Sequence, residues 1–204
     1  MKKIILSAVA VLAFGFTNAQ EVKFGAKTGL NISNITGDTD ELGYSSKTGL
    51  FFGGFAEVKI SDKFSFQPEL LFSNLGVKSE EVDILDDYKY ESKIVLNYLN
   101  VPLMAKFYVA DKFSLEAGPQ LGFLLSSKAK YTETFDGETE SGSEDIKDTF
   151  NGFDFGFNFG TSYDFTNNIS AGVRYSVGLS NILKDSGSFK SHNSNLAIAL
   201  AYKF

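Results

Sequence analysis

The feature of this sequence that most constrains its fold is alternation with a period of two residues. In "FDFGFNFGTSYDF", residues 153–165, every odd position carries Phe, Thr or Tyr, and every even position carries Asp, Gly, Asn or Ser. Successive side chains of a β-strand point to opposite faces. The segment is therefore predicted to form a strand with one apolar face and one small or polar face.

The same alternation recurs seven more times, which predicts eight strands. The other segments are residues 21–33, 48–60, 63–73, 96–107, 113–126, 169–179 and 195–204. Long polar connections, residues 33–47, 74–93, 127–150 and 181–193, alternate with tight turns around residues 61–62, 110–111 and 166–168. Because long and short connections alternate strictly, all the long ones lie at one end. This layout predicts an all-β fold, an eight-stranded antiparallel up-and-down barrel.

The first nineteen residues are predicted to be a cleaved secretory signal peptide. Lys2 and Lys3 precede the apolar run "IILSAVAVLAFGF", and "TNA" before Gln20 supplies the small residues that a signal peptidase reads. The apolar run is shorter than the ~20 residues that a spanning helix needs. Residues 20–204 are then a single barrel domain. The chain has no Cys, so no disulfide holds the exported fold together.

The direction of the large side chains distinguishes a membrane barrel from a secreted soluble barrel. The polar face of the strands consists mostly of Gly, Ala, Ser and Asn, which suits the narrow interior of an eight-stranded barrel better than a hydrated exterior. Aromatic residues also stand near the short-turn end of most strands, as in an interfacial girdle. The girdle comprises Phe24, Phe64, Phe107, Phe113, Tyr163 and Phe165. The sequence thus predicts a transmembrane β-barrel whose apolar face meets lipid.

Four segments carry a resemblance to a known family. "KFSFQPELLFS", "YLNVPLMAKFYV", "FSLEAGPQLGFLLSSK" and "RYSVGLSNI" resemble the outer-membrane β-barrel family of Bacteroidota, the PorT-like group, which is similar in architecture to OmpX- and OmpA-type barrels. The resemblance implies the outer membrane of a Gram-negative bacterium and insertion by the barrel assembly machinery. Tyr202 and the terminal Phe204 resemble the aromatic insertion signal of such barrels.

Six charged residues fall on the face that would line the lumen. They are Lys27, Glu57, Glu69, Lys106, Glu116 and Arg174. Charges in a narrow lumen are costly unless they are paired, so we expect an ion-pair network that fills the barrel as a structural plug. The alternative is a gated polar path for ions or protons.

The sequence contains no convincing catalytic or metal site. Its one histidine, His192, lies beside Ser191 and Ser194 with Asp185 in the same connection, but adjacent strand residues point to opposite faces. The acidic connections 74–93 and 127–150 do not match the spacing of an EF-hand, although clustered carboxylates can hold Ca²⁺. We therefore expect a protein without catalytic residues, cofactor or bound metal.

The three prolines, Pro68, Pro102 and Pro119, all fall within predicted strands. A proline cannot donate a ladder hydrogen bond, so local bulges are expected at these positions.

These features favour a non-enzymatic, monomeric outer-membrane barrel with a structural or adhesive role and acidic surface connections. The partners expected are outer-membrane lipid with lipopolysaccharide, the assembly machinery during insertion, and an envelope protein. The formal net charge of −6 argues against nucleic acid. A narrow channel and a subunit of a secretion or uptake complex are the alternatives.

Overall fold

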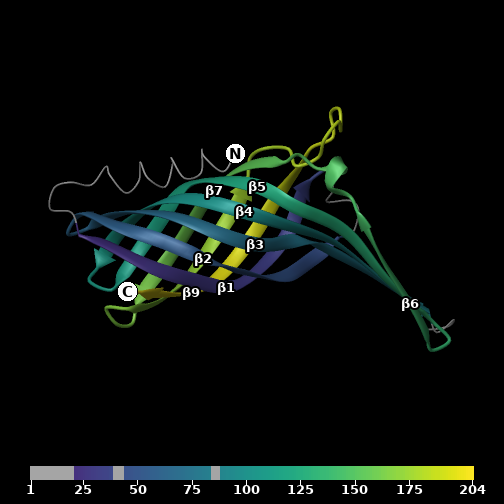
Figure 1. Ribbon diagram of the computed structural model, residues 1–204, viewed down its shortest axis with the longest axis horizontal. Helices are drawn as coiled ribbons and strands as arrows, with labels where there is room; N and C mark the ends of the chain where they lie inside the picture. The colour runs from purple at the N-terminus through teal and green to yellow at the C-terminus, as the bar shows by residue number, and fades with distance from the viewer. Residues whose placement is uncertain (1–20, 39–43, 84–87) are drawn as a thin grey trace.

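The computed structural model describes residues 21–38, 44–83 and 88–204, and these residues form nine strands and one short helix (Figure 1). The strands are β1 (Val22–Gly37), β2 (Ser45–Ser61), β3 (Phe64–Asp83), β4 (Tyr88–Ala110), β5 (Phe113–Phe135), β6 (Glu138–Asp145), β7 (Phe153–Asp164), β8 (Ile169–Gly178) and β9 (Ser191–Lys203). The 3-10 helix η2 (Lys147–Thr149) follows β6. In the part of the chain that the structure describes, no helix is long and apolar enough to cross a membrane.

Eight of the strands close a ring, and β6 lies outside it. The order of hydrogen-bonded neighbours is β4-β3-β2-β1-β9-β8-β7-β5, and pairing of β4 with β5 completes the barrel. Each ring strand pairs antiparallel with its neighbours. The predicted eight-stranded antiparallel up-and-down barrel is confirmed.

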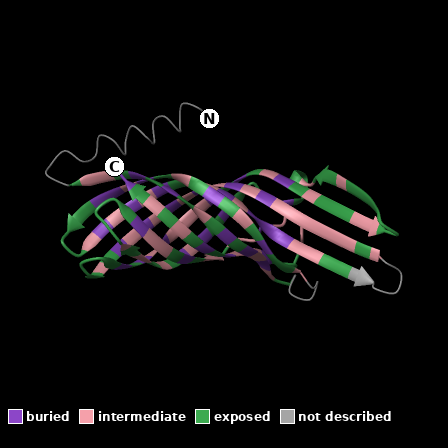
Figure 2. Cartoon of the chain, turned by 90° about the horizontal axis from the view of Figure 1, so that it is seen from below, coloured by how far each residue is buried: buried purple, intermediate pink, exposed green. Residues whose placement is uncertain are grey.

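Side chains alternate between the exterior and the interior along each strand, as the mixed colouring of the barrel in Figure 2 shows. In β7, Phe159 is 54% exposed on the outside, whereas Asn158 next to it is 0% exposed inside. In β9, Ile198 and Leu200 are exposed while Ala197 is buried. Large apolar side chains thus cover the outside, the reverse of the arrangement in a soluble protein.

The short connections and the end of the chain lie at one end of the barrel (Figure 1). The Lys203 N–H donates to the carbonyl of Asn168 in the β7–β8 turn, at 2.7 Å, and the Phe204 N–H donates to the carbonyl of Phe24 at 2.9 Å. Short turns face the periplasm in barrels of this kind. The opposite end is therefore the extracellular one.

The strands at the extracellular end continue beyond the eight predicted segments. The sequence allowed for this between the third and fourth strands, where residues 79–101 could prolong both strands above the membrane. Residues 74–83 continue β3, residues 88–95 begin β4, and residues 127–135 continue β5. The acidic segment Glu138–Asp145 forms β6, which pairs with β5 over eight residue pairs. Polar hairpins carry no apolar pattern, so strand content there depends on backbone pairing rather than burial. The result is a four-stranded sheet, in the order β3-β4-β5-β6, that extends beyond the rim of the barrel (Figure 1).

The prediction of bulges at the prolines was wrong. Register shifts occur between Ser46 and Phe51, between Lys59 and Ser61, and in the β4–β5 pair at Asn97/Tyr98 and at Tyr108/Ala110. The register is the same on both sides of each proline, for example Pro102 opposite Gln120 and Ala105 opposite Ala117. A missing N–H removes one ladder bond but does not require an extra residue.

Candidate functional site in the lumen and on the projecting sheet

Glu69 of β3 is the centre of a buried ion-pair network in the lumen. The Arg174 guanidinium donates two parallel hydrogen bonds to its carboxylate, from Nη1 to Oε2 at 2.8 Å and from Nη2 to Oε1 at 2.9 Å. Lys27 Nζ and Gln67 Nε2 donate to Oε1 at 2.5 and 2.6 Å. A carboxylate with four donors is fully satisfied, as burial of its charge requires.

The network continues towards the periplasmic end through Glu116 and Glu57. Arg174 Nη2 also donates to Glu116 Oε2 at 2.9 Å. Lys106 Nζ lies between the two glutamates, 3.6 Å from Glu116 Oε1 and 3.7 Å from Glu57 Oε2. The structure therefore brings all six of the expected lumen charges into one connected cluster.

Three further members were missed by the sequence analysis. Lys203 Nζ lies 3.0 Å from Glu57 Oε2 and 3.2 Å from Asp164 Oδ1, and Tyr108 Oη donates to Glu57 Oε1 at 2.5 Å. All three lie on the polar face of their strands, so the alternation of the sequence is consistent with a place in the lumen, although it did not single them out. Their contacts could not be predicted from the sequence, because they depend on the position of each residue along the barrel axis, which is set by the stagger of the strands.

The completed network takes one charged residue from each strand of the ring. The contributors are Lys27 (β1), Glu57 (β2), Glu69 (β3), Lys106 (β4), Glu116 (β5), Asp164 (β7), Arg174 (β8) and Lys203 (β9). Four are cations and four are anions, so the network is neutral in its ordinary ionisation state. We call it the lumen charge network.

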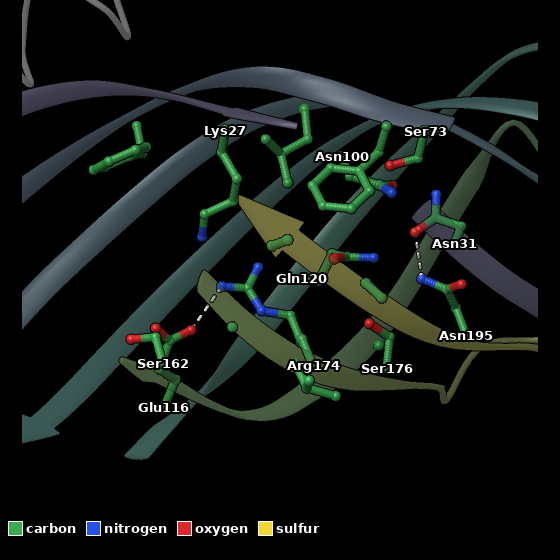
Figure 3. A pocket seen from close by; sticks show the side chains of 18 of the residues that line it. Lys27, Asn31, Ser73, Asn100, Glu116, Gln120, Ser162, Arg174, Ser176 and Asn195 are labelled. Carbon is green, nitrogen blue, oxygen red and sulfur yellow. Dashed lines mark hydrogen bonds and ion pairs between the residues drawn. The ribbon is translucent and has the colours of Figure 1, made fainter. Parts of the chain in front are cut away.

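A small cavity of about 60 Å³, lined by both polar and apolar side chains, borders this network (Figure 3). Asn195 Nδ2 donates to Asn31 Oδ1 at 2.9 Å in the wall formed by β1 and β9, and Arg174 and Lys27 border the same space. Asn31 Nδ2 and Asn195 Oδ1 are buried without a hydrogen-bond partner among the described protein atoms. Buried polar atoms of this kind are commonly satisfied by water, and the space suits a few water molecules.

An apolar cluster closes the lumen on the extracellular side of the cavity. Leu75 lines the cavity and also belongs to this cluster, in which Leu96 and Tyr98 are almost fully buried. Phe150 and Ile182 enter it from the connections after η2 and β8. We call this the apolar cap, consisting of Ile35, Leu75, Val77, Leu96, Tyr98, Leu124, Phe150 and Ile182. Paired charges and packed apolar side chains thus occupy the lumen at two successive levels.

The aromatic residues of the expected girdle lie on the outside near the short turns. Phe24, Phe107, Phe113, Tyr163 and Phe165 are exposed, and Phe64 is half-buried opposite Phe107. Tyr202, the other residue of the expected insertion signal, packs edge-on against Phe204 with ring centroids 5.8 Å apart.

His192 has the environment of a structural residue. Its Nδ1 lies 2.7 Å from the carbonyl oxygen of Ser180, and the flanking Ser191 is buried on the opposite face of β9. Within residues 21–38, 44–83 and 88–204, no three Asp, Glu, His or Cys side chains gather closely enough to hold a metal ion.

The projecting sheet has two chemically different faces. The face continuous with the lumen combines aromatic side chains with carboxylates. Its members beyond the apolar cap are Glu81, Tyr88, Tyr90, Tyr131, Glu133, Phe135, Glu138, Glu140 and Glu144, as the cross-strand pairing requires. We call this the acidic aromatic face. Partial desolvation, and then the carboxylates of Glu133 and Glu81, raise the pKa of Tyr88, in keeping with this placement.

Comparison with known proteins gives one family model and several solved structures. Residues 18–184 match the family model described as "Outer membrane protein beta-barrel domain". The fold is similar to the attachment invasion locus protein Ail of Yersinia pestis, with 14% identity, 90% of this chain and 99% of that chain covered, and a TM-score of 0.47. CarO2 of Acinetobacter baumannii is 11% identical, with 92% of this chain and 100% of that chain covered and a TM-score of 0.47. Neisserial surface protein A is 14% identical, with 90% of this chain and 99% of that chain covered and a TM-score of 0.44.

No curated protein matches the sequence significantly. The family model nevertheless covers most of the length, including the first eight strands in chain order and the connections between them. The chain therefore belongs to the outer membrane protein beta-barrel domain family.

Proposed function

We propose that this outer-membrane barrel is a non-enzymatic, non-conducting protein that presents a surface outside the cell for binding a positively charged polypeptide. The observation that carries the proposal is the projecting sheet. It holds the acidic aromatic face beyond the rim on continuous strands of the barrel, and Phe135 on that face is 57% exposed. Exposed aromatic side chains among carboxylates suit Lys- and Arg-rich partners, which they bind by ion pairing and cation–π contact.

The free edge of the sheet supports the same function. In the described part of the chain, β6 pairs with β5 along one edge, and its other edge has no partner strand. An unpaired edge can accept a strand from another protein, and its four carboxylates discourage pairing with a second copy of itself. The four are Glu138, Glu140, Glu144 and Asp145.

A shortened sheet tests the binding role. Glu80 opposes Glu91, so an Asn-Gly turn can replace residues 81–90. Tyr131 opposes Gly142, so a second Asn-Gly turn can replace residues 132–141. In cells that express the shortened protein, we expect normal barrel assembly and loss of attachment to surfaces coated with a lysine-rich peptide. A second test variant replaces Glu133, Glu138, Glu140 and Glu144 by Gln in the full-length sheet, and it should weaken attachment in low salt. Undiminished attachment by both variants would contradict the proposal.

The non-conducting character rests on the lumen charge network and the apolar cap. We expect silence in planar bilayers after incorporation has been verified by vesicle flotation and protease protection. A stable unitary conductance would favour the narrow-channel alternative.

The finer identity is proposed from the sequence. We infer a PorT-like barrel of Bacteroidota that is exported by a signal peptide, inserted by the barrel assembly machinery and monomeric in the membrane. Amino-terminal sequencing of the envelope-bound protein should begin at Gln20, and light scattering of the detergent-solubilised protein should give a monomer mass. A stoichiometric periplasmic partner recovered from the native envelope would instead favour a subunit of a secretion or uptake complex.

A further inference from the structure

A row of three lysines crosses the outward face of the projecting sheet. The register places Lys78 of β3 opposite Lys93 of β4, and Lys93 opposite Lys130 of β5. Directly opposed side chains in neighbouring strands have Cβ atoms about 4.5–5.5 Å apart, and like charges at such positions destabilise a sheet. The arrangement is costly in the isolated protein, which suggests an anionic partner.

Two more lysines adjoin this row. Lys128 stands on the same face, one step nearer the barrel, opposite Val95. Lys47 of β2 is only 8% exposed, and its ammonium donates to the side-chain oxygen of Asn74 and to the carbonyl oxygen of Thr48. Burial, and then the charges of Lys93 and Lys130, lower the pKa of Lys47. We call Lys47, Lys78, Lys93, Lys128 and Lys130 the lysine patch.

Carboxylates on this face neutralise the patch only in part. Glu91 pairs with Lys93 at 2.5 Å, whereas Glu80 pairs with Lys89 nearer the tip, at 2.8 Å. Asp145 lies opposite Lys128, and its Oδ1 accepts the backbone N–H of Lys147. The patch is therefore a positive area on a chain whose formal net charge is −6.

The position of the patch indicates what it meets. The continuous run of lipid-facing apolar side chains ends at Phe72 in β3, Leu99 in β4 and Leu125 in β5, and Val95 is the one apolar side chain on this face of β4 beyond it. A polar line follows, in which Asn74 Nδ2 donates to Asn97 Oδ1 at 2.6 Å and Asn97 Nδ2 donates to Ser126 Oγ at 2.9 Å. Lys128 follows Leu125 by three residues, roughly 10 Å along the strand. The lysines therefore stand just above the hydrocarbon band, where lipid headgroups lie.

We propose that the lysine patch binds the phosphate groups of lipopolysaccharide in the outer leaflet. Phosphates of lipid A would neutralise the opposed lysines through charge-assisted hydrogen bonds, while the acyl chains lie against the apolar band below. The proposal rests on the outer-membrane placement of the barrel and is independent of the binding role of the acidic aromatic face.

The test compares two triple variants with the same change in charge. The first replaces Lys78, Lys93 and Lys130 by Gln. The control replaces Lys59, Lys63 and Lys112 by Gln, all at the short-turn end. Purified full-length proteins in detergent are titrated with bisphosphorylated lipid A, with the same lipid A lacking phosphates, and with inorganic phosphate, and bound lipid is counted by native mass spectrometry.

We expect wild type and control to bind bisphosphorylated lipid A roughly tenfold or more tightly than the patch variant does. Dephosphorylated lipid A should bind weakly to all three proteins, and inorganic phosphate should not compete at equal concentration. Thermal unfolding without lipid should show the patch variant at least as stable as wild type, because a repulsive row has been removed. Equal binding of bisphosphorylated lipid A by wild type and patch variant, equal binding of the two lipids, or full competition by inorganic phosphate would overturn the assignment. The variant with the shortened sheet retains all five lysines. It should bind lipid A normally even if it no longer attaches to surfaces coated with the lysine-rich peptide.

Discussion

Arg174 and Glu69, 105 positions apart in the sequence, form a two-pronged ion pair straight across the barrel. Three strands separate β3 from β8 in either direction around the ring, so the pair joins opposite walls. Because both residues are buried and the guanidinium also reaches Glu116, the contact fixes the width of the lumen as well as neutralising charge.

Arg174→Met should lower the free energy of unfolding by about 3–5 kcal/mol, because Glu69 and Glu116 lose their shared cation while they remain buried. Urea titration of the barrel folded into vesicles measures the change. Combining the substitution with Glu69→Gln should recover much of the loss, since the stranded charge is removed as well. If the Arg174→Met protein were as stable as wild type, water would already screen the charges of the network.

Gly53→Ala should impair folding, whereas Gly54→Ala should not. A Cβ at Gly53, on the lumen face, would overlap the backbone carbonyl of Leu70 in the paired strand, which cannot move without separating β2 from β3. At Gly54, on the lipid face, the nearest atom would be the carbonyl oxygen of Gly25 at 3.6 Å, an ordinary contact. The folded fraction is read from the heat-dependent electrophoretic mobility of the barrel. Equal yields of the two variants would contradict the expectation.

Leu96→Ala should destabilise the protein by about 2–5 kcal/mol, because Leu96 is 0% exposed in the apolar cap and its removal leaves a cavity. Leu99→Ala on the lipid face of the same strand is the control, since acyl chains can fill the space it leaves. The comparison uses urea unfolding in vesicles, and a larger effect at Leu99 would argue against a packed cap.

Deletion of Phe204 should slow membrane assembly while leaving export intact. Phe204 is 75% exposed, its backbone N–H donates to the carbonyl of Phe24, and its ring contacts only the exposed ring of Tyr202 among the aromatic pairs of the described residues. We therefore expect the fold itself to gain little from the ring. Pulse-chase fractionation should show unfolded protein accumulating in the periplasm. Phe24→Ala, at the same end of the neighbouring strand, should assemble normally, and a deletion variant that assembles at the wild-type rate would remove Phe204 as an insertion signal.

The sequence was sufficient to predict the eight-stranded ring but not the projecting sheet. Period-two alternation identified the lumen face of every strand, and so placed Glu69 and Arg174 inside correctly. Beyond Leu125 the alternation no longer predicts which face a residue occupies, because β5 has one extra residue between the pairs Tyr98–Leu124 and Asn97–Ser126. This single residue turns Ser127 inward and Lys128 and Lys130 outward, the reverse of the extrapolated pattern. A bulge in a polar hairpin leaves no mark in the sequence, so neither the lysine patch nor β6 could be predicted.

The supply of one charge to the lumen charge network by each ring strand has a consequence for how the barrel is assembled. A slip of one residue in any strand would transfer its charge from the lumen into the hydrocarbon and leave an opposite charge uncompensated. Omission of a strand would have the same unbalancing effect. Only the closed eight-strand ring in the native register satisfies every charge, so the network favours correct closure over each neighbouring misaligned alternative.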